Sequence, residues 1–259
     1  MPDLLDALAK DAIKTIKEGY YETSTKIAQL HLSLREAILS SRRAAIISEI
    51  KFNSPSAGVL REDRDLRRIS GEMEEGGAVA ISILTEPKHF KGDISYVAEV
   101  REQVKVPILM KDIVLSPIQI EAASSTGADA VLLIQTLFDR GYGEKDVHGM
   151  IEDAHSRGLE VLLEVHTRRE FLSAVRTEAD MVGINNRDLK TLEVSLETTK
   201  RLLTPHDAAR EVIVSESGID GPEDIRILRR YGAQAFLLGT IVMRADSIKM
   251  KVKELVEAL

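Results

Sequence analysis

The chain contains no cysteine and no tryptophan, and phenylalanine and tyrosine together make up only 4% of its residues. The absence of cysteine excludes disulfides, thiolate metal sites and a cysteine nucleophile, and it is compatible with a reducing compartment. No stretch approaches the roughly 18 apolar residues that a membrane-spanning helix needs. Residues 1–6 also lack the basic segment followed by an apolar one that begins a secretory signal peptide. We therefore expect a cytoplasmic protein that does not contact a membrane.

Positive charge is not concentrated anywhere along the sequence. The 35 Lys and Arg residues are outnumbered by 42 Asp and Glu residues, which gives a formal net charge of −7. Proteins that bind nucleic acid carry clustered basic residues, so we expect no nucleic-acid partner. An acidic surface can still contain a basic pocket, and a small anionic substrate is compatible with this composition.

From residue 44 onward, short apolar runs rich in β-branched residues alternate with amphipathic helical patterns. The runs cover residues 45–50, 78–84, 106–110, 130–134, 161–163, 181–184, 212–214 and 235–238. Eight strands, each followed by a helix at a spacing of about 25–30 residues, are typical of a (β/α)8 barrel, whereas an open doubly wound sheet usually has fewer strands. Because no linker interrupts the 259 residues, we predict an α/β fold, a TIM barrel in one domain covering residues 1–259.

Two helical patterns precede the first predicted strand. Leu4, Leu8, Ala12 and Ile16 fall on one face of a helix, and residues 33–36 have the pattern of a capping box. No strand lies before them. Residues 1–43 are therefore predicted to form an N-terminal helical extension that packs on the barrel.

Ionisable or amide side chains occur where most of these apolar runs end. They are Glu49 and Lys51 at the first run, Lys111 at the third, Glu164 at the fifth, Asn185 at the sixth and Glu216 at the seventh. Barrel enzymes carry their reactive groups at the carboxyl ends of the strands, so we expect two amines, three carboxylates and an amide to meet at one rim. Neighbouring lysines lower each other's pKa and carboxylates oppose that shift, which suits acid–base chemistry. Taken singly, each residue could instead be a structural ion pair, a solvated strand end or a turn former.

Glycine-bearing turns follow the last two predicted strands. Ser217 and Gly218 follow the seventh strand, and Gly239 and Thr240 follow the eighth. In barrels these two loops commonly bind phosphate through backbone N–H groups at helix N-termini. We therefore predict a phosphorylated substrate, to which Ser54 and Arg187 could donate further hydrogen bonds. The alternative is that the glycines serve only tight turns.

The histidines do not predict a metal site. The six histidines show no HExxH or related spacing. We interpret His166 as a structural residue near the start of the next helix, because Thr167 is expected to begin that helix. Asp112 should point away from Lys111 in a regular strand and support the outer layer of the barrel.

Several blocks of the sequence, in order along the chain, resemble those of indole-3-glycerol phosphate synthases. The blocks are SEIK at 48–51 followed by SPS at 54–56, LTE at 84–86 with Phe90 and Gly92, MKD at 110–112, LEVH at 163–166, GINNRDL at 183–189, SESGI at 215–219, and LG at 238–239 with MR at 243–244. This resemblance implies a lyase of tryptophan biosynthesis that acts on 1-(2-carboxyphenylamino)-1-deoxyribulose 5-phosphate. The enzyme closes the pyrrole ring with loss of carbon dioxide and water, and it works without a metal or an organic cofactor.

The resemblance also implies a role for each matching residue. Lys111 would be the general acid that protonates the ribulose carbonyl, Lys51 held by Glu49 would bind the substrate carboxylate, and Glu164 would be the partner acid–base. The division of the dehydration step between Lys51 and Glu164 is left open. By the same resemblance, Asn185 and Glu216 would position hydroxyls or catalytic groups. The phosphate would be held by Ser54, Arg187, Gly218, Gly239 and Thr240, and Ser217 lies between these two sets. Phe90 and Leu189 would contact the substrate.

The sequence departs from the family pattern at a few positions. Ile113 stands where the family usually has Phe, Phe52 and Asn53 stand where basic or polar residues are common, and Ala57 stands where Lys is often found. The first change could loosen the aromatic wall around the anthranilate ring, and none of them alters the acid–base residues.

Two other functions are compatible with the same barrel. One is a Schiff-base sugar-phosphate aldolase with Lys111 as the amine nucleophile, and the other is a non-catalytic barrel that binds a phosphorylated ligand. The sequence is equally compatible with a monomer and with a small homo-oligomer.

Overall fold

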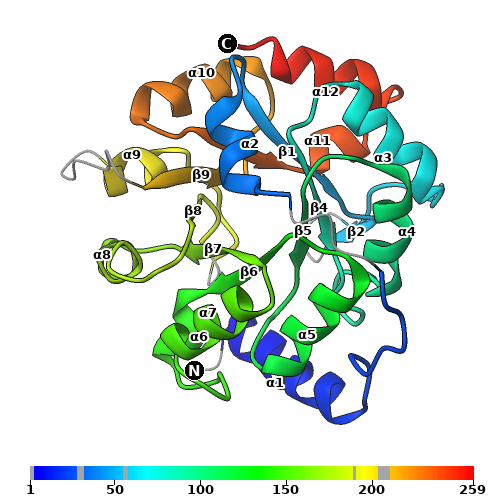
Figure 1. Cartoon of the computed structure of the whole chain (residues 1–259). Helices are drawn as coiled ribbons and strands as arrows, with labels where there is room; N and C mark the ends of the chain where they lie inside the picture. Colours follow the sequence, from blue (N-terminus) through cyan, green and yellow to red (C-terminus); the bar gives the residue numbers. More distant parts are fainter. Residues whose placement is uncertain (1–2, 28–31, 55–57, 189–190, 204–210) are drawn as a thin grey trace.

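The structure is a computed structural model that describes residues 3–27, 32–54, 58–188, 191–203 and 211–259. Eight parallel strands form a closed barrel (Figure 1). They are β1 (Ala45–Ile50), β4 (Ala80–Leu84), β5 (Ile108–Lys111), β6 (Ala130–Ile134), β7 (Glu160–Val165), β8 (Met181–Asn185), β9 (Val212–Glu216) and β10 (Ala235–Leu238). β1 pairs with both β4 and β10, so the ring has no free edge. The predicted (β/α)8 barrel is confirmed.

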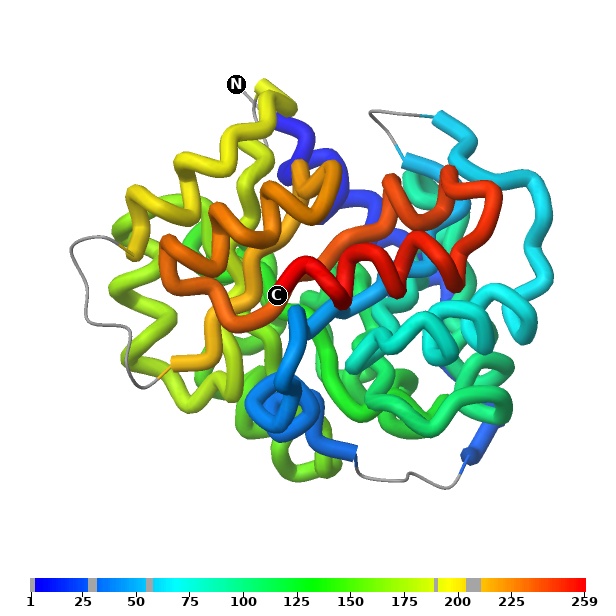
Figure 2. Tube along the Cα trace, turned by 90° about the horizontal axis from the view of Figure 1, so that it is seen from above, coloured from blue at the N-terminus to red at the C-terminus, as the bar shows by residue number. Residues whose placement is uncertain are grey.

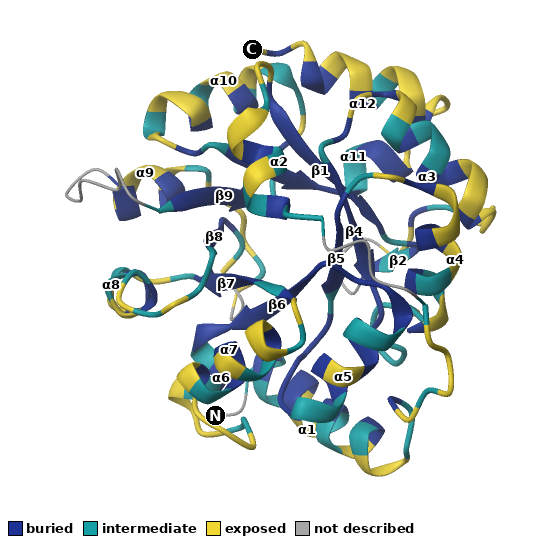
Figure 3. Ribbon diagram, in the orientation of Figure 1, coloured by how far each residue is buried: buried dark blue, intermediate teal, exposed yellow. Residues whose placement is uncertain are grey.

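Side chains alternate between the inside and the outside of the barrel along each strand. On β1, Ala45 and Ile47 belong to the apolar cluster inside the barrel, whereas Ile46 and Ile50 belong to the cluster between the strands and the helices. Small and branched side chains therefore fill the barrel interior, which is a packed core and not a pore. Figure 3 shows the buried strands surrounded by helices with exposed outer faces.

Helices surround the barrel between successive strands. They are α3 (Leu66–Glu75), α4 (Ser95–Gln103), α5 (Pro117–Thr126), α6 (Gln135–Asp139), α7 (Val147–Ser156), α8 (Arg168–Ala174), α9 (Glu197–Leu203), α10 (Pro222–Tyr231), α11 (Thr240–Met243) and α12 (Ile248–Val256). Pro222 begins α10 and Gly232 ends it, with a φ of 111° that favours glycine. Within the described ranges, no helix has the length and apolar character needed to cross a bilayer.

The two N-terminal helices lie at opposite ends of the barrel, as Figure 2 shows. α2 (Leu34–Ser40) lies at the end where the strands begin, and the backbone N–H of Arg35 donates to Glu160, the first residue of β7, over 2.9 Å. α1 (Leu4–Lys17) lies at the other end, where Leu5 and Leu8 join the apolar cluster that contains Ile113. The extension therefore contributes to the end of the barrel at which catalytic groups are expected.

Four strands extend beyond the apolar runs from which they were predicted. β5 ends at Lys111, β7 passes through Glu164, β8 ends at Asn185 and β9 ends at Glu216. The predicted ends at residues 110, 163, 184 and 214 were therefore too early. An apolar run reveals only the part of a strand whose side chains are apolar. Here the strand pairing continues past the apolar residues, for example between Asn185 and Glu216, because the inward polar side chains contact one another.

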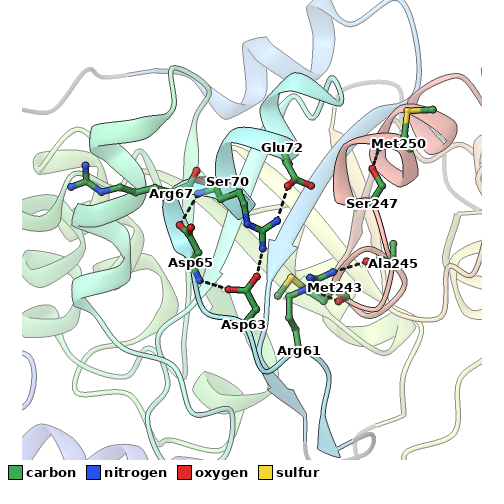
Figure 4. Close-up of polar contacts among 11 residues, drawn as sticks. Arg61, Asp63, Asp65, Arg67, Ser70, Glu72, Met243, Ala245, Ser247 and Met250 are labelled. Carbon is green, nitrogen blue, oxygen red and sulfur yellow. Dashed lines mark hydrogen bonds and ion pairs between the residues drawn. The ribbon is translucent and has the colours of Figure 1, made fainter.

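A short hairpin that the sequence did not predict follows β1. It consists of β2 (Asn53–Ser54) and β3 (Gly58–Val59). Just after it, the Arg61 guanidinium donates to the backbone oxygens of Met243 and Ala245, over 2.9 and 2.5 Å (Figure 4). Arg61 thereby ties the segment that carries Ser54 to the turn of helix that follows β10.

Candidate active site

A cavity of about 490 Å³ opens at the carboxyl ends of the strands. Most of the predicted site residues line it: Glu49, Lys51, Ser54, Phe90, Lys111, Glu164, Asn185, Arg187, Ser217, Gly218, Gly239 and Thr240. Glu216 is fully buried beside this cavity and contacts Lys111. Leu189, the remaining predicted residue, lies outside the described residues. The expected convergence on one rim is therefore observed.

Lys111 is the centre of the charged cluster. Its Nζ lies 3.2 Å from Oε2 of Glu49 and 3.0 Å from Oε2 of Glu216. Burial disfavours the charged amine, but the negative charges of Glu49, Glu216 and Glu164 outweigh burial and raise the pKa of Lys111. Lys111 is therefore a cation that can donate a proton to a developing oxyanion but is poorly suited to act as an amine nucleophile.

Glu49 lies between the two lysines. Its Oε1 is 2.7 Å from Nζ of Lys51, so the side chain of Glu49 on β1 and that of Lys51 just after this strand point to the same side. Burial alone would raise the pKa of Glu49, but Lys111 and Lys51 overcome this effect and lower the pKa to about 2. Glu49 is thus a fixed negative charge that orients both amines.

Glu216 differs from Glu49 because, among the described residues, only one of its carboxyl oxygens has a hydrogen-bond or ion-pair partner. Burial raises the pKa of Glu216 to about 7, even though Lys111 opposes the shift. Its Oε1 has no hydrogen-bond partner within the described part of the chain, and a Cβ added at Gly183 would lie 2.3 Å from this atom. Glycine at position 183 therefore provides the space that the Glu216 carboxyl occupies.

Glu164 projects into the same cavity from β7. Burial opposes its ionisation, but His166, Lys111 and a hydrogen bond from Asn185 lower the pKa of Glu164. The site thus holds an ionised carboxylate and a protonated amine that can transfer protons in opposite directions. The sequence did not predict that His166 contacts Glu164, because the residue was interpreted as part of the helix start.

The loops after β9 and β10 bring backbone close to the charged cluster. Ser217 and Gly218 both have positive φ values, 68° and 73°, and the buried Asn186 amide fixes this turn by donating to the Ser217 carbonyl over 3.2 Å. Gly239 approaches Glu49 so closely that an added Cβ would lie 2.7 Å from Oε1. The turns and the amines therefore line one cavity, as a substrate with a charged group at each end would require.

An apolar wall faces these polar groups. It combines Leu4, Leu5 and Leu8 of α1 with Phe90, Ile113, Leu132 and Ile134. The Glu86 carboxylate holds the loop that carries Phe90 by accepting hydrogen bonds from the backbone N–H groups of residues 88, 89 and 90, over 2.9, 2.7 and 2.9 Å. The sequence placed α1 on the barrel without assigning it to the site, because an apolar helix face does not reveal which surface it covers.

Comparison with known proteins decides the family. The sequence model of the family described as indole-3-glycerol phosphate synthase matches residues 6–255. The chain belongs to this family. It is 44% identical over 214 residues to the indole-3-glycerol phosphate synthase of Shouchella clausii, with 81% of each chain covered, and 43% identical over 229 residues to that of Methanopyrus kandleri, with 87% of each covered.

A solved structure supports the fold independently of the sequence. The thiamine phosphate pyrophosphorylase of Pyrococcus furiosus matches with a TM-score of 0.60, covering 87% of this chain and 97% of that one. The two proteins are only 17% identical, so this likeness concerns the barrel alone.

The departures from the pattern of indole-3-glycerol phosphate synthases differ in where they lie. Ile113 lines the cavity and is nearly fully buried, so it forms part of the apolar wall. Phe52 is buried away from the cavity, where it packs edge-on against Tyr96 at 6.0 Å. Asn53 donates to the backbone oxygen of His89 over 3.0 Å and so joins β2 to the loop that carries Phe90. Ala57 lies outside the described residues.

Asp112 supports the outer layer, as the sequence predicted. Its Oδ2 accepts hydrogen bonds from the hydroxyls of Tyr21, at 3.0 Å, and Thr85, at 2.5 Å, while Oδ1 accepts one from the backbone of Ile113. Burial raises the pKa of Asp112 to about 6 despite these bonds. Because Tyr21 follows α1, this carboxyl ties the N-terminal extension to the end of β5.

Proposed function

We propose that the chain is a decarboxylating lyase that converts 1-(2-carboxyphenylamino)-1-deoxyribulose 5-phosphate into indole-3-glycerol phosphate, carbon dioxide and water. Membership of the family supports the reaction. The reaction is assigned to this cavity because Lys111 contacts two buried carboxylates there and Glu164 lines the same cavity. We also propose that the protein acts in the cytoplasm.

Ring closure requires an acid at the ketone. The aryl carbon that bears the carboxylate attacks the ketone carbon, and the ketone oxygen takes a proton from the Lys111 ammonium. The adjacent negative charges that keep Lys111 protonated are fixed by the barrel, so little reorganisation is needed during the reaction. Loss of carbon dioxide then restores the aromaticity of the ring.

Dehydration requires both an acid and a base. The hydroxyl formed at the former ketone leaves as water after taking a proton, and a base removes a proton from the ring. Glu164, whose pKa is lowered, is suited to act as the base. Lys51, oriented by Glu49, is suited to hold the substrate carboxylate and to supply the proton. Asn185 and Glu216 would orient the substrate hydroxyls and the amines.

The substrate phosphate would lie opposite the amines. Backbone N–H groups at Gly218, Gly239 and Thr240 would hold it, with additional donors from Ser54, Ser217 and Arg187. The aryl ring would lie on the apolar wall that contains Phe90 and Leu8, and Leu189 is proposed to join that contact. Binding at both ends would hold the aryl carbon near the ketone, which lowers the entropic part of the barrier.

The test is turnover of the carboxyphenylamino substrate by the purified chain, followed by the fluorescence of the indole product. We expect product at catalytic, not stoichiometric, amounts. Borohydride reduction in the presence of substrate should leave the mass of the protein unchanged. A covalent adduct on Lys111 would instead favour the Schiff-base aldolase, and tight binding without product would favour a non-catalytic ligand-binding barrel.

A further inference from the structure

His166 follows β7 directly and lies between two carboxylates. Its Nε2 is 3.2 Å from Oε1 of Glu164, and its Nδ1 is 3.7 Å from Oε2 of Glu170 on α8. The side chain is only 12% exposed. Both contacts are ion pairs, and neither ring nitrogen has a well-aligned hydrogen-bond partner among the described residues. A buried imidazole between two carboxylates is not explained by a role in beginning α8, which the Thr167 side chain fulfils by accepting a hydrogen bond from the backbone of Glu170.

We propose that His166 is a positioning residue whose imidazolium keeps Glu164 ionised and directed into the cavity, while Glu170 keeps His166 protonated. The inference rests on the proposed function, in which Glu164 is the base. His166 would not touch the substrate in this scheme. It would act through Glu164 alone.

The balance of charge around the cavity explains why Glu164 needs this cation. Burial raises the pKa of a carboxylate, so a nearby cation increases the fraction of the carboxylate that is ionised and able to act as a base. Lys111 contacts Glu49 and Glu216 directly, and Lys51 contacts Glu49. Both amines are therefore already paired, and His166 is the cation in direct contact with Glu164 among the described residues.

Glu170 is well placed to hold the imidazolium. One of its oxygens accepts a hydrogen bond from the backbone N–H of His166 over 2.8 Å, which fixes the carboxylate beside the ring. Burial alone would raise the pKa of Glu170, but His166 and a hydrogen bond from Thr136 on α6 lower it to about 2. The two carboxylates in turn overcome burial and raise the pKa of His166 to about 9.

The charged groups that act on His166 come from two elements. Glu164 lies on β7 and Glu170 lies on α8. Of the other elements beside α8, α6 contributes the neutral Thr136. α9 meets α8 where the Arg168 guanidinium donates to the backbone oxygen of Leu202. The largest effects on the pKa of His166 come from burial and from the carboxylates of Glu164 and Glu170.

The test compares the full-length chain with His166→Gln and His166→Lys across a pH series. A charge within about 4–6 Å shifts a carboxyl pKa by roughly 1–3 units. In His166→Gln we therefore expect the acidic limb of kcat/KM to move at least about one unit to higher pH. At a pH on the acidic limb, kcat/KM of His166→Gln should be at least about tenfold lower than that of the unmodified chain. Near pH 8 the difference between the two should be small. His166→Lys should move the limb back toward its original position, because it restores a cation.

The matched control is His155→Gln on α7. His155 also pairs with a carboxylate, Oδ2 of Asp180, at 2.9 Å, but it is 38% exposed and does not line the cavity. Its pH profile should coincide with that of the unmodified chain. A His166→Gln profile that also coincides, or an equal shift in both variants, would overturn the proposal.

A second measurement does not depend on activity or on the folding of a variant. Nitrogen NMR of the histidine rings in the unmodified chain should show both nitrogens of His166 protonated at pH 7.5, with titration near pH 9. A neutral ring at pH 7.5 would also overturn the proposal. If the chain shows no turnover but His166 is an imidazolium, the proposed function fails while the charge arrangement stands, so the two failures are distinguishable.

Discussion

Replacing Lys111 with methionine isolates the contribution of its charge. Methionine keeps most of the apolar stem but removes the ammonium that contacts Glu49 and Glu216. Glu49 retains Lys51 at 2.7 Å, and Glu216, whose pKa is already about 7, would bind a proton once the opposing charge of Lys111 is lost. The buried cluster can therefore lose one cation without leaving an isolated negative charge, and we expect the variant to fold.

The expected effect on catalysis is large. A positioned general acid contributes roughly 10²–10⁴-fold to a rate, which corresponds to about 3–5 kcal/mol of activation free energy. We therefore expect kcat of Lys111→Met to fall by at least about 10²-fold. The assay is indole fluorescence under saturating substrate, with circular dichroism to establish folding.

Lys105→Met is the matched control for this experiment. Lys105 is an exposed lysine just before β5, at the opposite end of the barrel from the cavity. Its replacement should leave kcat unchanged. A folded Lys111→Met variant with a rate within about threefold of the original would refute the role of Lys111 as the acid, because such a change is far below the loss expected on removing a general acid.

Three further substitutions test separate parts of the site. Glu164→Gln should lower kcat by about 10²-fold or more with little change in KM, because an amide cannot accept the proton; steady-state kinetics would contradict this if KM alone rose. Gly183→Ala would place a Cβ 2.3 Å from Oε1 of Glu216, so we expect the displaced carboxyl to reduce kcat at least about tenfold, and an unchanged kcat would show that Glu216 can move freely. Tyr21→Phe removes the 3.0 Å hydrogen bond to Asp112 and should lower the free energy of unfolding by about 1.5–3 kcal/mol; an unchanged urea midpoint would argue against that contact.

The barrel and the convergence of its polar residues could be predicted because both follow from periodic patterns. Eight apolar runs at regular spacing indicated eight strands, and parallel strands bring their carboxyl ends to one rim. The exact ends were less predictable. Lys111 and Glu216 belong to strands because their backbones pair with those of Leu84 and Asn185. Their side chains contact each other across the barrel, and such long-range pairs leave no local signal in the sequence.

The contributions of α1 and His166 could not be predicted for a related reason. The apolar face of α1 indicated that the helix packs on something, but only the fold shows that Leu5 and Leu8 reach the cavity. The spacing of Glu164, His166 and Glu170 is visible in the sequence. Their meeting depends on the angle between β7 and α8, which local patterns do not specify.

The most direct test of the central claim measures two products of one reaction. Purified protein is mixed with carboxyl-labelled 1-(2-carboxyphenylamino)-1-deoxyribulose 5-phosphate, and labelled carbon dioxide is counted against indole fluorescence. We expect one carbon dioxide for each indole-3-glycerol phosphate formed, over many turnovers, with both signals lost together in Lys111→Met. Release of carbon dioxide without indole-3-glycerol phosphate would contradict the proposed reaction. Persistence of both signals in Lys111→Met would contradict the role of Lys111.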